Sequence, residues 1–454
     1  MLPKPASAVC LQQHALDWAL KHLTRFGDTV FLPKAFEYDA ILEDWKSLSD
    51  WLTSQDMRDL EPRPYRRLLA VKTQGSFRYV TQLDPLEHLA FAGLMYGVGQ
   101  ELEASRLPTA AQTVFSWRFA PQPDGTMYDP LFRWKEFNLR CRELAERKTT
   151  KFVVVADIAD FFPHLYLHPV ERTLERCTKT REQAYCVLRM LKGWNARVSH
   201  GIPVGPPSGR IVADATLTDL DKALIGRGVR YCRYSDDFRI FCRSEPEARS
   251  LLEFLAETLF ETYGLTLQAA KTLIEVAEYL KRFALSADRL EAESLEEKFH
   301  LLLEQAGWES VYEKEIECDD LPEDVRVEID KLNLAELFRG QLTKERYDPV
   351  VVSLLLQGLG QLDHDELVDD IMANMAKLEP VVDAVVAFLI ALRSLSDARR
   401  CKIGRRILSL ATNRRASRYQ VACLLNVFTH DREFDNEDSF ERAFEKVPPK
   451  GREN

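Results

Sequence analysis

Residues 228–242 constrain the fold of this 454-residue chain more than any other stretch. Two short runs rich in β-branched and aromatic residues flank a polar tip, Ser235 to Asp237. This is the pattern of a β-hairpin with two carboxylates at its turn. Adjacent like charges in a tight turn are unfavourable unless a cation lies beside them. Asp is also common in turns that have no function, so this stretch alone leaves both interpretations open.

A second stretch supplies a partner for the hairpin. Residues 152–156 form an apolar run that leads directly into Asp157, which is typical of a central strand buried on both faces. Three carboxylates without a neighbouring His or Cys favour a hard cation over zinc. Two such ions about 3.5–4 Å apart can stabilise the attacking and leaving oxygens of a phosphoryl transfer. The sequence therefore predicts two Mg²⁺ ions, with Mn²⁺ as the alternative, held by Asp157, Asp236 and Asp237.

A loop rich in Gly and Pro lies between these two stretches. It spans residues 201–210 and is followed by apolar residues at 4-3-4 spacing through Leu224, which predicts a helix opening directly after the loop. Glycines in such a loop allow the backbone to approach a ligand closely. Taken alone, this stretch is also compatible with an ordinary turn.

Taken together and in this order, the motifs resemble the palm of a reverse transcriptase. Asp157, Asp236 and Asp237 match its catalytic triad, and residues 201–208 match its Gly-x-Pro-x-Gly-Pro loop. The block 264–272 resembles the motif that follows, where Lys271 would meet the leaving pyrophosphate, donate a proton, or form a structural salt bridge.

The resemblance also implies a nucleotide pocket. Phe162 would pack below the sugar and reject ribonucleotides, with Asp160 lining the same pocket. A predicted hairpin at 67–80 is similar to the fingers of these enzymes and places cations near a triphosphate. The implied nucleotide-binding residues are Lys72, Arg78, Asp160, Phe162, Gly201, Pro203, Val204, Gly205 and Ser208.

One departure from the usual pattern points to a subgroup. Retroviral, intron and retron enzymes usually carry Gln where this chain has Val204. Val-Gly-Pro at this place resembles the bacterial defence-associated and abortive-infection reverse transcriptases, which implies an antiviral, anti-phage role. A retron or intron type that copies a dedicated RNA is one alternative, and a catalytically idle RNA-binding assembly protein is another.

Composition and charge distribution indicate where the protein is located and what it binds. No secretory leader or membrane-spanning run is evident, so we expect a cytoplasmic protein without membrane contact. The net charge of −10 is unevenly distributed, because residues 291–330 hold fifteen acidic against three basic residues. Residues 393–418 instead carry nine Lys and Arg against one Asp, which suits a polyanion. The predicted nucleic-acid-binding residues are Arg399, Arg400, Lys402, Arg405, Arg406, Arg414, Arg415 and Arg418.

The expected fold is α+β, a right-hand polymerase with fingers and an antiparallel palm, followed by an all-α HEAT-like domain in place of a thumb. The expected parts are an N-terminal helical segment at 1–64, fingers at 65–150, the palm at 151–284, a helical domain at 285–437 and a charged tail at 438–454. Expected partners are dNTPs, an RNA template or noncoding RNA, the DNA product, the chain itself as a protein primer, and a second copy or second protein.

Overall fold

The computed structural model describes residues 2–29, 31–35, 37–63, 65–73, 76–195, 198–278 and 332–430, together with Phe434. The chain divides into two compact units. Unit 1 comprises residues 1–28, 37–66 and 81–291, and unit 2 comprises residues 29–36, 67–80 and 292–454. Residues 285–331 of the expected helical domain and the charged tail at 438–454 lie outside the described residues.

A four-stranded antiparallel sheet organises unit 1. Its spatial order is β4 (Arg230–Tyr234), β5 (Asp237–Cys242), β3 (Phe152–Asp157) and β6 (Leu273–Val276). Val153 and Val154 are both fully buried. Successive strand residues point to opposite faces, so β3 is covered on both sides, as its apolar run predicts.

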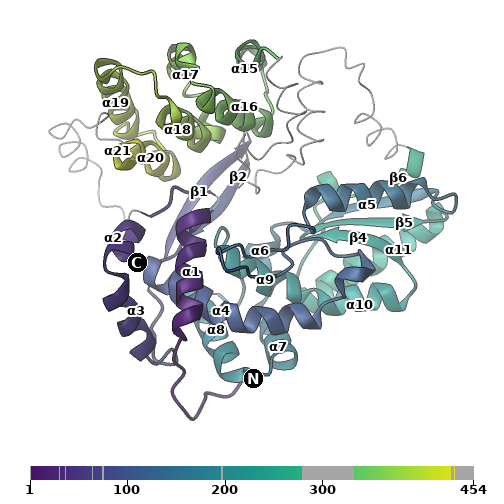
Figure 1. The fold of residues 1–454 in the computed structure, drawn as a ribbon. Helices are drawn as coiled ribbons and strands as arrows, with labels where there is room; N and C mark the ends of the chain where they lie inside the picture. The colour runs from purple at the N-terminus through teal and green to yellow at the C-terminus, as the bar shows by residue number, and fades with distance from the viewer. Residues whose placement is uncertain are drawn as a thin grey trace. The chain divides into compact units, whose positions relative to one another are not determined.

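Two helices cover this sheet. α5 (Trp134–Glu146) packs on β4 and β5, whereas α11 (Glu245–Thr258) packs on β3, β5 and β6 (Figure 1). α11 begins where the Ser244 side chain accepts a hydrogen bond from the backbone N–H of Glu247, an N-cap that satisfies one free donor of the first turn. The helix continues as a short π-helical segment and ends at Gly264, whose φ is 69°.

The rest of unit 1 is helical. α4 packs against α1, α8 and α9, so it lies at the centre of this helical layer. The single helix expected after the Gly/Pro loop is two helices that meet at Leu217. The helices are α1 (Gln13–Phe26), α2 (Glu37–Glu43), α3 (Trp45–Ser54), α4 (Pro85–Ser105), α6 (Phe161–His164), α7 (Leu167–Cys177), α8 (Arg181–Trp194), α9 (Pro207–Thr216) and α10 (Thr218–Gly226).

Unit 2 joins most of a β-hairpin to a set of helices. β1 (Arg66–Thr73) and β2 (Ser76–Gln82) form the predicted hairpin, of which residues 67–80 belong to this unit. α15 packs on α16, α16 on α18, and α20 on both α18 and α19 (Figure 1). The expected C-terminal helical region is therefore present, and its HEAT-like repeat character stays a prediction. The helices are α15 (Leu334–Thr343), α16 (Pro349–Gln361), α17 (Val368–Ala373), α18 (Val382–Ala391), α19 (Asp397–Ala411), α20 (Arg418–Leu425) and α21 (Val427–His430).

A membrane-spanning helix must be both long and apolar. None of the helices in the described ranges meets both conditions.

Candidate active site

Two neighbouring strands carry the aspartates at one end of the sheet. The antiparallel register of β3 and β5 sets Asp157 opposite Asp237. The backbone N–H of Ile158 donates to the carbonyl of Asp236 at 3.0 Å. Ser235 closes the intervening turn with a φ of 55°, in the left-handed region. The fold thus brings together the backbones of the three aspartates that the sequence singles out.

Burial and mutual repulsion make the carboxyl groups of Asp236 and Asp237 difficult to ionise. Burial raises the pKa of Asp236 to about 7, and the charges of Asp237 and Asp157 add to this rise. Burial also raises the pKa of Asp237; Arg239 opposes that shift and Asp157 adds to it. The buried cluster therefore lacks the solvation that would stabilise its negative charge.

Two cations of the chain partly compensate this charge. The Nζ of Lys271 lies 2.8 Å from Oδ1 of Asp157, and Arg239 forms a longer contact of 3.4 Å with Asp237. Lys271 ends a short 3₁₀ turn that begins after Gln268, whose backbone N–H donates to the carbonyl of Asp157 at 2.7 Å. Of the roles considered for Lys271, the structure displays the salt bridge.

The donor chemistry of the triad fits a divalent cation. Carboxylate oxygens are the ligands that Mg²⁺ and Mn²⁺ prefer, and the raised pKa of Asp236 reflects negative charge that a cation would stabilise. Within the described part of the chain, no group of three or more His, Cys, Asp or Glu side chains is placed to hold a metal ion. Asp157 accepts a hydrogen bond from Lys271 through Oδ1, which leaves Oδ2 for a further partner.

The Gly/Pro loop is fastened to the segment that follows Asp157. The N–H groups of Gly201 and Ile202 donate to the carbonyls of Leu165 and Phe162, each at 2.8 Å. Gly201 has a φ of 105°, and a Cβ at this position would lie 3.0 Å from the carbonyl oxygen of Pro163. This residue therefore meets both reasons for requiring glycine, a left-handed backbone and a close approach.

The other end of the loop bonds to the backbone of β2. The carbonyl of Val204 accepts a hydrogen bond of 2.7 Å from the N–H of Thr81. Pro203 and Gly205 are buried. The buried hydroxyl of Ser208 has no hydrogen-bond partner among the residues that the structure describes. The loop is thus held by its backbone at both ends.

Asp160 and Phe162 differ in exposure. Asp160 is exposed with a φ of 45°, whereas Phe162 is half-buried with its ring 5.1 Å from that of Phe161. A half-buried ring leaves a face available to a sugar, and the role of Phe162 in rejecting ribonucleotides stays a prediction.

A buried ion-pair network behind the hairpin was not predicted from the sequence. The fully buried Arg233 forms ion pairs of 2.6 Å with Asp214 of α9 and with Asp221 of α10. Its guanidinium also donates to the carbonyl of Ser235 at 3.0 Å, so the network holds the turn that carries Asp236. The sequence feature that could have indicated this network is Asp214, a carboxylate within the otherwise apolar run from Ile211 to Ala215.

Further partners complete the network. Arg106 contacts Asp214, and the Ser116 hydroxyl donates to it at 2.8 Å. Burial opposes ionisation of Asp214, but Arg233 and Arg106 outweigh burial and lower the pKa of this carboxyl. Charges buried in this way are stable only when paired, so the network fixes the hairpin against α9 and α10.

The family comparison covers the aspartates, the Gly/Pro loop and the buried ion-pair network. Residues 106–300 match the family described as reverse transcriptase (RNA-dependent DNA polymerase). This segment matches a reverse transcriptase domain and indicates an RNA-directed DNA polymerase. It includes the aspartate-bearing strands, the Gly/Pro loop and Lys271.

Other comparisons add little. The comparison with curated proteins finds no match. Among solved structures, the telomerase of Candida albicans in complex with a TWJ fragment of telomeric RNA is 12% identical, with a TM-score of 0.36. The alignment covers 82% of this chain and 71% of that chain. A score of this size identifies neither a shared fold nor a shared function.

The predicted triphosphate cations lie outside the reverse transcriptase domain. Lys72 and Arg78 are on β1 and β2 and belong to unit 2. The guanidinium of Arg78 lies 5.1 Å from the ring centre of Phe31, in the same unit. Their proposed contact with a nucleotide stays a prediction.

The predicted C-terminal cations fall into two groups. Arg399 pairs with Asp365 at 3.0 Å, and Arg400 is 6% exposed and donates to the carbonyl of Leu392 at 2.8 Å. These two arginines stabilise unit 2 internally. The exposed group consists of Lys402, Arg405, Arg406, Arg414, Arg415 and Arg418.

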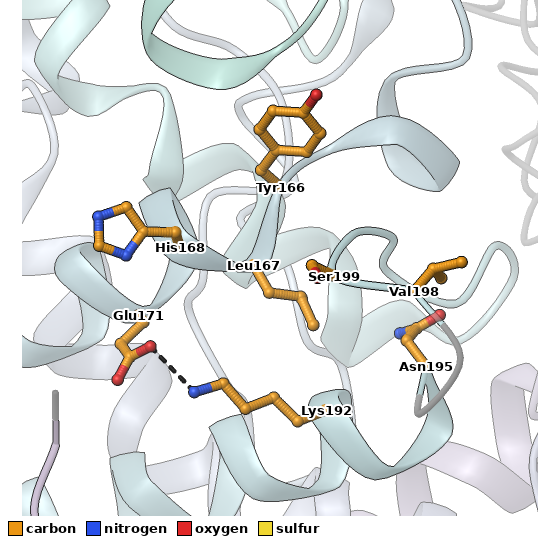
Figure 2. A pocket seen from close by; sticks show the side chains of 8 residues that line it. All are labelled: Tyr166, Leu167, His168, Glu171, Lys192, Asn195, Val198 and Ser199. Carbon is orange, nitrogen blue, oxygen red and sulfur yellow. Dashed lines mark hydrogen bonds and ion pairs between the residues drawn. The ribbon is translucent and has the colours of Figure 1, made fainter.

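A separate cavity of about 480 Å³ lies in unit 1 (Figure 2). An ion pair of 2.9 Å between Lys192 and Glu171 lies at one side, with the Leu167 side chain projecting between α7 and α8. The cavity is lined by Tyr166, Leu167, His168, Glu171, Lys192, Asn195, Val198 and Ser199. None of the predicted site residues is among them.

Proposed function

We propose that this chain polymerises deoxynucleotides at Asp157, Asp236 and Asp237, with two Mg²⁺ ions as cofactors. The observation that carries the proposal is the register of β3 and β5, which places Asp157 opposite Asp237 with Asp236 in the adjoining turn. The raised pKa values of Asp236 and Asp237 point in the same direction, because a bound cation would offset the repulsion among the carboxylates.

The proposed reaction is an in-line phosphoryl transfer. The 3′-hydroxyl oxygen of the growing strand bonds to the α-phosphorus of a dNTP, while the bond from that phosphorus to pyrophosphate breaks. The hydroxyl proton is released and pyrophosphate leaves. Bound Mg²⁺ supplies the positive charge that stabilises the attacking and leaving oxygens.

The surrounding residues would position the nucleotide. Lys271, beside Asp157 at 2.8 Å, would face the leaving pyrophosphate. Phe162 would contact the sugar, and residues 201–208 would shape the pocket because their backbone is fixed at both ends. Lys72 and Arg78 would neutralise the triphosphate.

The test is incorporation of labelled dNTPs by the purified chain in Mg²⁺, beside the isosteric variant Asp236→Asn. Reactions contain either no nucleic acid, an RNA template with a DNA primer, or nucleic acid that co-purifies from cells. Product is separated on a denaturing gel before and after protease and RNase treatment. Sensitivity to protease would identify the chain as its own primer, and sensitivity to RNase would identify the template.

Product from the wild type alone is the expected result. Asp236→Asn should fold at least as stably as the wild type, because it removes a carboxylate whose pKa burial has raised. Equal incorporation by both proteins would refute the assignment. No product under any condition would favour an RNA-binding assembly protein that does not catalyse polymerisation.

We further propose a role in antiviral defence. This rests on the Val-Gly-Pro sequence at residues 204–206 and its resemblance to the abortive-infection group, rather than on the chemistry of any residue. The test is a plaque assay over a broad phage panel with the wild type and Asp236→Asn. Protection by the wild type alone is expected, and unchanged plaquing throughout would exclude the role.

A further inference from the structure

One strongly charged surface of unit 2 is not used by the proposed polymerase chemistry. We call it the basic surface, and it lies on α19 and the segment that leads into α20, beyond the matched residues 106–300. It consists of Lys402, Arg405, Arg406, Arg414, Arg415 and Arg418. All six side chains are exposed.

Helical geometry gathers three of these charges on one side of α19. Lys402, Arg405 and Arg406 are at i, i+3 and i+4 and therefore share one face. The opposite face is buried and includes Ile403, Gly404, Ile407, Leu408 and Ala411. The buried face fixes the rotation of the helix, so the cations are held outward by packing.

The charge of this surface is not neutralised within the part of the chain that the structure describes. There, none of the six cations forms an ion pair with an acidic side chain, in contrast to Arg399, which pairs with Asp365 and Asp369. Lys402, Arg405 and Arg406 share one helix face, and like charges on one face repel one another. A polyanionic ligand would remove that repulsion.

The amino-acid composition of the basic surface distinguishes between a membrane, a protein and a phosphate-bearing ligand. Residues 402–418 are all described, and none of their large apolar side chains is exposed. A membrane-binding helix needs apolar residues to insert, and a protein interface needs an apolar core. Five of the six cations are arginine, whose guanidinium donates two parallel hydrogen bonds to a phosphate.

We propose that the basic surface binds the phosphodiester backbone of a nucleic acid, without sequence preference and independently of the polymerase site. The proposal needs neither the triad nor Mg²⁺. It can therefore stand if the polymerase assignment fails, and it can fail while polymerisation is observed.

The test is binding of a labelled mixed-sequence single-stranded RNA to the full chain by fluorescence anisotropy, in EDTA and without dNTPs. The variant is Arg405→Gln with Arg406→Gln. Each phosphate contact on a single strand contributes about 0.7 to the slope of log affinity against log salt. Loss of two contacts should flatten that slope by about 1.4 and weaken binding about 25-fold at 0.1 M salt.

A matched control separates this surface from overall charge. Arg339→Gln with Arg346→Gln removes the same two charges from exposed positions on and after α15, where Arg339 already pairs with Asp370. The control should change affinity less than about threefold. Equal losses in the two variants, or an unchanged salt slope in the first, would overturn the proposal.

A local readout keeps the proposal testable if other sites also bind RNA. Hydrogen exchange of the full chain, with and without the RNA, should show slower exchange at residues 412–418 in the wild type but not in the variant. Absence of that protection would overturn the proposal. Single-stranded DNA and duplex RNA probes should bind through the same residues, because the backbone is the shared ligand, and a strong preference for one sequence would also contradict it.

Discussion

Replacing Arg233 with Met should destabilise unit 1 strongly. The Arg233 side chain is fully buried, its ion pairs to Asp214 and Asp221 are both 2.6 Å, and it holds the Ser235 carbonyl at 3.0 Å. Met is apolar and of similar length, so the substitution removes the charge while retaining most of the packing. Asp214 keeps the nearby Arg106.

The expected loss of unfolding free energy in Arg233→Met follows from the contacts of Arg233. Removing one partner of a buried ion pair typically costs about 3–5 kcal/mol. Since Arg106 still compensates Asp214, we expect a loss near the lower end, about 3 kcal/mol. The assay is urea unfolding followed by tryptophan fluorescence, because six of the seven tryptophans belong to unit 1.

A second substitution tests the cause. In Arg233→Met, the Asp221 carboxylate stays buried without the guanidinium that pairs with it at 2.6 Å. Adding Asp221→Asn removes this uncompensated charge and should restore at least about 1 kcal/mol. A loss below about 1 kcal/mol in Arg233→Met, or no recovery in the double variant, would refute the reasoning.

Three further predictions follow from the same unit. Lys271→Met should let Mg²⁺ raise the melting temperature more than in the wild type, because the ammonium no longer occupies the Asp157 carboxylate; equal shifts by scanning fluorimetry would contradict this. Burial lowers the pKa of His22 to about 4 and of His88 to about 3. The stability that comes from keeping these two imidazoles neutral is therefore complete above about pH 6.5, and it is lost as the pH falls toward these pKa values. Urea unfolding across pH should show a shallower fall in His22→Phe, by up to about 3 kcal/mol at pH 4. Gly201 has a φ of 105°, so Gly201→Ala should cost about 1–3 kcal/mol of stability and reduce dNTP incorporation. In the control Gly226→Ala, no atom lies within 4 Å of the new Cβ, so stability and incorporation should both stay unchanged.

Local sequence determined the elements that carry the proposed chemistry. The apolar run before Asp157 required a strand buried on both faces, and the β-rich runs around Ser235 required a hairpin. These signals are local because hydropathy patterns and turn propensity are read from residues adjacent in sequence. The order of the motifs then sufficed to predict the antiparallel sheet and the reverse transcriptase domain.

Tertiary structure decided which charged side chains are available to a ligand. By sequence, Arg400 and Arg405 are equivalent members of one basic run, yet packing buries Arg400 against backbone carbonyls and leaves Arg405 exposed. Likewise, Arg233 looks like an ordinary strand residue, but Asp214 and Asp221 come from two other helices to surround it. The charge state and role of such a residue depend on groups distant in sequence, which only the assembled fold brings into contact.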